Sequence, residues 1–208
     1  MHFEAPPASR IAGEMQRFLH WFESRATDPP LVRAALAHVW FLTIHPFADG
    51  NGRIGRAIAD LVLARTDRDV ASCVSLARRI LRDRAAYYAA LSAAQRGSLD
   101  MTAWASWFIE CYRRAAEDTL VSADELLRAA AFWRAHADVD INARQRKVLE
   151  RYLGGGFEGW LNSRNYRAIA KTSADTAQRD LADLARKGLI FPNDGKARKT
   201  SYRLGDLK

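Results

Sequence analysis

The stretch that decides the fold is HPFADGNGRIGR, residues 45–56, which packs a histidine, an aspartate, three glycines and two arginines into twelve positions. It follows directly on the apolar run VWFLTI, residues 39–44. A central, nearly all-apolar helix is predicted over residues 31–44, and Pro46 ends it because proline cannot join the helical hydrogen-bond ladder. A second helix is predicted from about Gly52, with its inward-facing positions at Ile54, Ile58, Leu61 and Val62. The stretch therefore reads as a helix, a tight turn and a helix.

The predicted turn has the features of an anion-binding site. Gly50 and Gly52 allow positive φ, so that successive N–H groups can converge on one point at a helix N-terminus, where the dipole also favours negative charge. Arg53 and Arg56 are three residues apart and share the helix face above this point. Guanidinium groups fit phosphate oxygens. We interpret the turn as a site for a nucleotide di- or triphosphate.

Two further side chains of the turn suggest chemistry on that phosphate. Asp49 would repel a phosphate unless a cation lay between them, and Mg²⁺ is the ion that one carboxylate and phosphate oxygens can hold together. His45 could accept a proton from an attacking hydroxyl near neutral pH. An alternative is a metal site made by His38, His45 and Asp49. That alternative explains neither the glycines nor the arginines, and we interpret His38 as a core histidine with a local hydrogen-bond acceptor.

The stretch resembles the signature of the Fic family, HxFx(D/E)GNGRxxR. Every fixed position of the signature is filled, by His45, Phe47, Asp49, Gly50, Asn51, Gly52, Arg53 and Arg56. The flanking segments FEAPPASRIAGEM, LVRAALAHVWFLTIHPF and RAAYYAAL are also similar to Fic proteins, so that the resemblance covers roughly residues 1–115. It implies a Fic-type helical bundle and a protein adenylyltransferase, which transfers AMP from ATP to a Ser, Thr or Tyr hydroxyl and releases pyrophosphate.

The resemblance also implies roles for individual residues. His45 would be the base that activates the target hydroxyl, and Asp49 would hold Mg²⁺. Phosphates would be bound by Asn51, by the backbone at Gly50 and Gly52, and by the two arginines, Arg53 toward the β-phosphate and Arg56 at the γ-phosphate. Phe47 would anchor the loop in the core. An adenine pocket is implied at Tyr88, Leu91 and Gln95, residues whose helical spacing is equally typical of packing.

The resemblance further predicts how activity would be restrained. Fic active sites are covered by a β-hairpin flap, of which only the last part, at His2–Glu4, is expected here, so we expect an N-terminal region to be missing. Many Fic proteins carry an inhibitory helix of pattern (S/T)xxxE(G/N). Glu110 comes nearest, with Ser106 before it, but Cys111 follows where the pattern has Gly or Asn. We therefore predict no inhibitory motif in this chain and inhibition, if any, in trans.

The net charge is distributed unevenly along the 208 residues. The net charge is +8, and residues 141–208 contain 15 Lys and Arg against 7 Asp and Glu, so the excess lies in the last third. Such asymmetry indicates a second domain with a polyanionic partner. We predict three segments: residues 1–118 as the Fic-like core, 119–140 as a linker helix and 141–208 as a winged helix-turn-helix domain.

The last third has the pattern of a winged helix. In YRAIAKTSADTAQRDLADLARKGLI a short helix, a turn at Lys171 and a helix capped by Ser173 precede Gly188. A β-hairpin follows, and its wing carries the expected DNA contacts Lys196, Arg198 and Lys199. The acids of the second helix argue against DNA binding, since phosphates would repel Asp175, Asp180 and Asp183. A winged helix is also a common protein-interaction module.

The sequence leaves several functional hypotheses open. An adenylyltransferase, impaired by its incomplete flap, is the first. A winged-helix DNA-binding regulator and a nucleotide-binding interaction protein without transfer are the others, and other transferred groups or the reverse reaction also remain. The expected partners are ATP with Mg²⁺ and a target protein, with DNA and a second copy of the chain as further candidates. No segment approaches the roughly 20 apolar residues of a membrane span. The stretch MHFEAPPASR lacks the apolar core of a secretory signal, so we do not expect export. Cys73 and Cys111 suggest free thiols in the cytoplasm.

Overall fold

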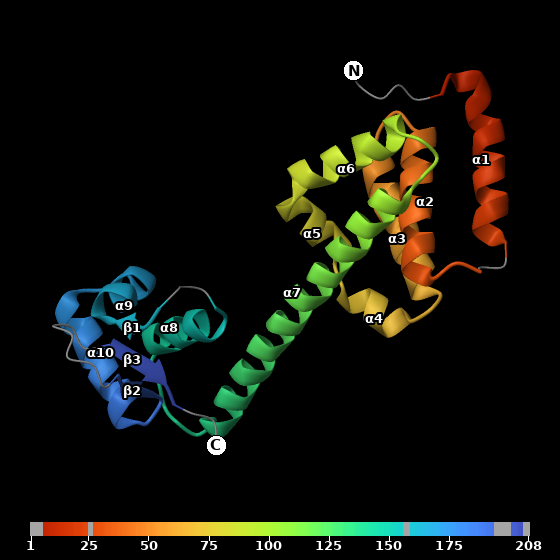
Figure 1. Ribbon diagram of the computed structural model, residues 1–208. Helices are drawn as coiled ribbons and strands as arrows, with labels where there is room; N and C mark the ends of the chain where they lie inside the picture. The colour runs from red at the N-terminus through yellow and green to blue at the C-terminus, as the bar shows by residue number, and fades with distance from the viewer. Residues whose placement is uncertain (1–5, 25–26, 156–158, 194–200, 206–208) are drawn as a thin grey trace. The chain divides into compact units, whose positions relative to one another are not determined.

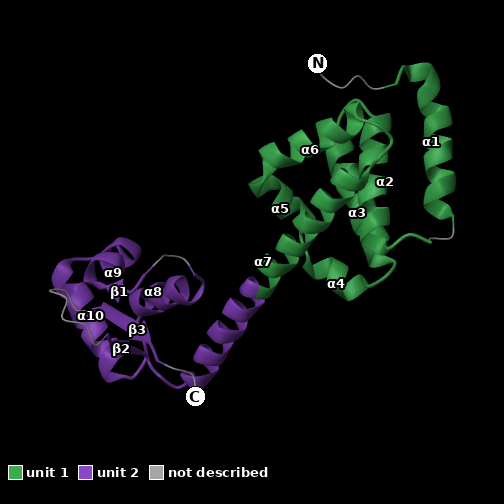
Figure 2. Ribbon diagram, in the orientation of Figure 1, with its two compact units in different colours: residues 1–120 green, residues 121–208 purple. Residues whose placement is uncertain are grey.

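The computed structural model describes residues 6–24, 27–155, 159–193 and 201–205, and the predicted mainly α fold is confirmed (Figure 1). Two compact units, Met1–Leu120 and Val121–Lys208, divide the chain, and the division falls within the long helix α7 (Thr102–Ala135) (Figure 2). Among the described residues, no helix combines the length and apolarity that crossing a membrane requires.

The first unit is built around one apolar helix. Besides the first part of α7, its helices are α1 (Ala8–Glu23), α2 (Pro30–Ile44), α3 (Asn51–Ala64), α4 (Arg68–Cys73), α5 (Leu76–Arg82) and α6 (Arg84–Arg96). The helices α1, α2 and α3 run side by side, and α2 packs most extensively against α3 (Figure 1). Nine of the 15 residues of α2 are buried, which confirms its predicted central place.

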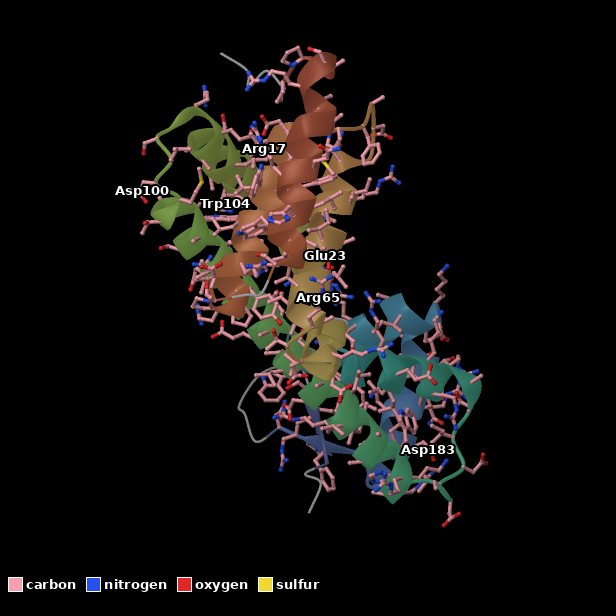
Figure 3. The ribbon with its side chains drawn as sticks, turned by 90° about the vertical axis from the view of Figure 1, so that its right-hand side faces the viewer. Arg17, Glu23, Arg65, Asp100, Trp104 and Asp183 are labelled. Carbon is pink, nitrogen blue, oxygen red and sulfur yellow. The ribbon has the colours of Figure 1, made fainter. Side chains whose placement is uncertain are left out.

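Polar contacts tie the neighbouring helices to α2 and α3. Trp104 of α7 is buried, and its indole Nε1 donates a hydrogen bond to the Ala35 carbonyl of α2 at 2.8 Å. At the end of α1, Glu23 forms an ion pair with Arg65, just past α3, with an N–O distance of 3.3 Å (Figure 3). On α1, Phe18 and Phe22 are buried in the core, whereas Leu19 is 49% exposed because it lies beside the buried face.

The buried face of α3 agrees with the predicted one at Val62 and at Ile58, which packs against the core, and differs from it at the other two positions. Ile54 and Leu61 are exposed, and the residues that face the core are Asn51, Gly55, Ala59, Val62 and Leu63. The physical reason is the close approach of α2, which needs small residues at the contact. A Cβ added at Gly55 would lie 3.3 Å from Cγ and Cδ2 of Leu42. Ile54 and Leu61 therefore lie on the flanks of the contact.

This packing predicts that Gly55→Val destabilises the protein by about 2 kcal/mol, because the added atoms would meet Leu42 in a close-packed contact. The matched control is Gly13→Ala on α1, where an added Cβ meets nothing within 4 Å. That change should raise the unfolding free energy by about 0.5–1 kcal/mol, the ordinary gain of Gly→Ala in a helix. Urea unfolding of both variants measures the two effects. Equal stability of Gly55→Val and the parent would contradict the close contact.

The second unit is a small α/β structure. Its elements after α7 are α8 (Ala143–Leu153), β1 (Leu161–Asn162), α9 (Ser163–Ala170), α10 (Ala174–Arg186), β2 (Ile190–Pro192) and β3 (Ser201–Leu204). The sheet has the order β1-β3-β2, and both pairings are antiparallel. The segment expected as a linker at 119–140 is mostly the end of α7, and its Phe132 is buried in the core of this unit.

The helix-turn-helix segment forms as its local signals predict. Lys171 ends α9 with φ 52°, and Ser173 caps α10 by accepting a hydrogen bond from the Thr176 N–H. The buried positions of α10 are Ala177, Asp180, Leu181 and Leu184, which form its core face. The two-residue strand β1 was not predicted, since it is too short to show a pattern. The predicted wing contacts Lys196, Arg198 and Lys199 and the predicted flap residues His2–Glu4 lie outside the described residues.

Candidate active site

The turn between α2 and α3 is held by two residues with positive φ. His45 follows α2 with φ 52° and ψ 54°, and its N–H donates to the Phe41 carbonyl at 3.0 Å. Gly50 has φ 85°, and its carbonyl accepts hydrogen bonds from the N–H groups of Arg53 and Ile54. The prediction of positive φ is correct for Gly50 and wrong for Gly52. Because α3 begins one residue earlier than predicted, Gly52 lies within its first turn.

Asn51 braces this turn with its side chain. It is buried, its amide nitrogen donates to the Phe47 carbonyl at 2.5 Å, and its amide oxygen accepts from the Phe47 N–H at 3.1 Å. Both ends of the amide are thus occupied within the loop. A phosphate contact from Asn51 would come from its backbone N–H, which is one of the first four of α3 and has no acceptor inside the helix.

A cavity of about 350 Å³ opens beside the turn. Its walls come from α2, the turn and α3 on one side and from α6 on the other, and are formed by Leu42, His45, Gly52, Arg56, Tyr87, Tyr88, Leu91 and Gln95. The structure therefore brings the predicted base, one glycine and one arginine of the motif together with all three residues expected in the adenine pocket. Gln95 is tied to α2 by a hydrogen bond from its amide to Thr43 Oγ1 at 3.5 Å.

The two arginines of the motif fold back over the turn. A Cβ added at Gly52 would lie 3.6 Å from Arg56 Nη1, and one at Gly50 would lie 3.5 Å from Arg53 Nη2. The absence of these Cβ atoms leaves room for the guanidinium groups above the N-terminus of α3. Positive charge thus gathers where the backbone N–H groups also favour an anion.

Other motif residues lie outside the walls of the cavity. Asp49 and Arg53 have side chains that are 94% and 76% exposed, and they form an ion pair with an N–O distance of 3.4 Å. An exposed pair of this kind contributes little to stability, so both groups are available to a ligand.

The expected anchoring role of Phe47 was wrong. Phe47 is 49% exposed, and its ring contacts that of Phe41 in the core. The loop is held at the Phe47 backbone by Asn51.

Comparison with known proteins adds to this geometry. Residues 1–63 match the model of the Fic/DOC family. The chain carries a Fic domain. A Fic family protein from Desulfovibrio desulfuricans G20, known as a crystal structure, aligns with 96% of this chain and 56% of its own at a TM-score of 0.53 and 26% identity.

Curated relatives resemble part of this chain. A probable protein adenylyltransferase of Aquifex aeolicus is 28% identical over 97 residues, which are 47% of this chain and 28% of the relative. Protein adenylyltransferase Fic of Drosophila mojavensis is 44% identical over 62 residues, or 29% of this chain and 12% of that protein. Protein adenylyltransferase fic-1 of Caenorhabditis elegans is 34% identical over 91 residues, 43% and 17% of the two chains. The chain thus spans less than a third of the length of these relatives.

His38 of the Fic domain is a core residue rather than a metal ligand. Its ring is fully buried and stacks on Trp104, while its Nε2 lies 3.0 Å from the Tyr87 hydroxyl. The expected local acceptor was wrong, since this partner comes from α6. Among the described residues, no group of three or more His, Cys, Asp and Glu side chains is placed to hold a metal ion. The alternative site of His38, His45 and Asp49 therefore has no support in the geometry.

The burial of His38 predicts that the stability of the Fic domain depends on pH. Burial, helped by the nearby charge of Arg56, lowers the pKa of His38 from 6.5 to about 4. Between these two values the unfolded chain binds the proton more strongly, so stability falls as the pH decreases through this range. The loss should reach about 2.5 kcal/mol at pH 4.5. Urea unfolding followed by tryptophan fluorescence at pH 7 and pH 4.5 measures it.

The control for this pH dependence is a second histidine. His38→Gln should remove this part of the slope, whereas His20→Gln, at an exposed position of α1, should keep it. An unchanged slope in His38→Gln would refute the assignment to His38.

Sequence reasoning missed two cavity residues and one packing residue of the first unit. Leu42 lies three positions before His45, on the same side of α2, and this spacing could have indicated it. Tyr87 was passed over in favour of Tyr88, although its ring also lines the cavity and burial raises the pKa of its hydroxyl to about 12. Gly55 falls on an unspecified position of the signature, so the signature does not indicate its close contact with Leu42.

Proposed function

We propose that this chain is a protein adenylyltransferase, an enzyme that transfers AMP from ATP to a Ser, Thr or Tyr hydroxyl of a target protein. The observation that supports the proposal is the composition of one cavity. His45, Gly52 and Arg56 line it together with Tyr88, Leu91 and Gln95, and its volume of about 350 Å³ falls in the usual range of small-molecule pockets. The proposal takes the imidazole as the base and the motif residues as the phosphate-binding groups. Relatives named protein adenylyltransferase agree with this assignment.

The residues of the site have separate tasks in the proposed reaction. The His45 imidazole takes the proton of the target hydroxyl as its oxygen forms a bond to the α-phosphorus of ATP. The bond from that phosphorus to the bridging oxygen breaks, and pyrophosphate leaves. Arg53, Arg56 and the first N–H groups of α3 bind the β- and γ-phosphates and stabilise the negative charge that develops on the leaving group. Tyr88, Leu91 and Gln95 hold the adenine.

Asp49 is the residue that would hold Mg²⁺. Its carboxylate is exposed beside the N-terminus of α3. A single carboxylate fits the usual binding of Mg²⁺, which relies on one or two carboxylates, substrate phosphates and water. When bound, the ion would neutralise charge on the phosphates of ATP. The ion pair between Asp49 and Arg53 would then be exchanged for contacts with the ion and the phosphates. The cytoplasmic location and the homodimeric state expected from the sequence stay predictions.

Labelling with an alkyne-tagged ATP in a cell lysate tests the proposal. The chain should transfer the tag to one or a few proteins, and an excess of untagged ATP should suppress the labelling. Mass spectrometry of the labelled protein should find AMP on a Ser, Thr or Tyr hydroxyl. If the chain binds ATP and labels no protein, a nucleotide-binding interaction protein would be the better description. A different nucleotide on the target would contradict the assignment of AMP.

A further inference from the structure

Two of the three acidic residues of α10, Asp180 and Asp183, are turned into the second unit. Asp180 is buried, and it accepts hydrogen bonds from Arg144 at 2.9 Å and from the Tyr166 hydroxyl at 2.8 Å. Asp183, labelled in Figure 3, accepts a hydrogen bond from Gln145 at 2.9 Å and pairs with Lys187 at 2.8 Å. These two carboxylates are consumed by contacts with α8, α9 and the end of α10. They therefore do not present the repulsion that the sequence predicted toward phosphates.

The opposite face of α10 carries a different set of side chains. Gln178, Arg179 and Ala182 are exposed and lie at i, i+1 and i+4, so they share one side of the helix away from Ala177 and Leu181. Gln and Arg are the side chains that most readily form paired hydrogen bonds with adenine and guanine edges in the major groove. Asp175 remains exposed near them. It lies in the first turn of α10, where its negative charge interacts favourably with the helix dipole.

Basic residues flank this face on the preceding helix and turn. Arg164 and Arg167 of α9 are exposed, as is Lys171 in the turn between the two helices. Within the described part of the chain, none of these three cations, nor Arg179, takes part in an ion pair. A helix-turn-helix places its second helix in the major groove and its first helix across the phosphate backbone. The chemistry of the two helices matches these two positions.

We propose that the second unit binds duplex DNA through α9 and α10. Gln178 and Arg179 contact base edges in the major groove, and Arg164, Arg167 and Lys171 contact phosphates. This surface lies outside the candidate active site and does not depend on nucleotide transfer. The DNA contacts are thus assigned to α9 and α10, whereas the sequence analysis predicted them in the wing.

Selection from a random duplex library with the full chain tests the proposal. A recurring site should emerge, and fluorescence anisotropy should then measure its affinity against that of an unrelated duplex. Arg179→Ala should weaken binding to the selected site by about 5- to 150-fold and reduce the preference over the unrelated duplex. Arg164→Ala should weaken binding to both duplexes and lower the slope of log affinity against log salt by about 0.9.

Two controls make the test decisive. Arg17→Ala removes an exposed arginine of the first unit, with a side chain 72% exposed, and should leave both affinities unchanged. Circular dichroism should give each variant the melting temperature of the parent, because Gln178, Arg179 and Arg164 are exposed. The proposal is overturned if no site emerges from the selection or if Arg179→Ala binds like Arg17→Ala. It is equally overturned if the double variant Gln178→Ala, Arg179→Ala loses a protein partner and keeps its DNA affinity.

Discussion

His45→Ala is expected to lower the rate of AMP transfer by about 10²–10⁴-fold and to leave the affinity for ATP within about twofold of the parent. A positioned general base acts in the transition state, so its removal affects turnover rather than nucleotide binding. His45 is suited to this role because it is exposed at the edge of the cavity while its backbone is fixed by the bond to Phe41. The measurement is transfer of radiolabelled AMP to the identified target, alongside calorimetric titration with ATP.

The matched control for this prediction is His20→Ala, which removes an exposed histidine of α1. It should change neither transfer nor ATP affinity. Circular dichroism should show that both variants keep the helical content of the parent. If His45→Ala transferred AMP at the parental rate, the assignment of His45 as the general base would be contradicted. A loss of ATP affinity equal to the loss of rate would make His45 a binding residue instead.

The turn could be predicted from the sequence because its signals are local. Pro46 sets the end of one helix, and Gly50 marks the position that needs positive φ. The roles of Asn51 and Phe47 within the same turn could not be read in this way. Whether the Asn51 amide meets a phosphate or the Phe47 backbone depends on how the loop closes, which residue types alone do not determine.

The opposite wall of the cavity is a non-local feature. Tyr88 lies more than 40 residues after His45, and no spacing within α6 indicates that it faces the turn. The resemblance to Fic proteins, rather than periodicity, placed Tyr88, Leu91 and Gln95 there. The directions of side chains in the second unit likewise could not be predicted from the sequence. The sequence predicts Asp180 on the surface that would meet phosphates, whereas its hydrogen bonds with Arg144 of α8 and Tyr166 of α9 turn it inward.

Arg56→Ala is expected to weaken ATP binding by about 30- to 150-fold, which corresponds to about 2–3 kcal/mol of lost charge-assisted hydrogen bonding. Arg56 lines the cavity, and its Nη1 lies above Gly52 in the first turn of α3. Because the guanidinium is expected at the γ-phosphate, the affinity for AMP should stay within about twofold. Titration calorimetry with ATP and with AMP measures the two effects separately.

Two further variants define what Arg56 contributes. Arg56→Lys keeps the charge but not the planar fork, so it should recover only part of the lost ATP affinity. Arg53→Ala should weaken ATP binding less than Arg56→Ala does, because the Arg53 side chain is 76% exposed and lies outside the walls of the cavity. Equal losses of ATP and AMP affinity in Arg56→Ala would show that the arginine supports the pocket as a whole. A supporting role of this kind requires no contact between Arg56 and the γ-phosphate. The expected orientation of the triphosphate, with its γ-phosphate at Arg56, would then be wrong.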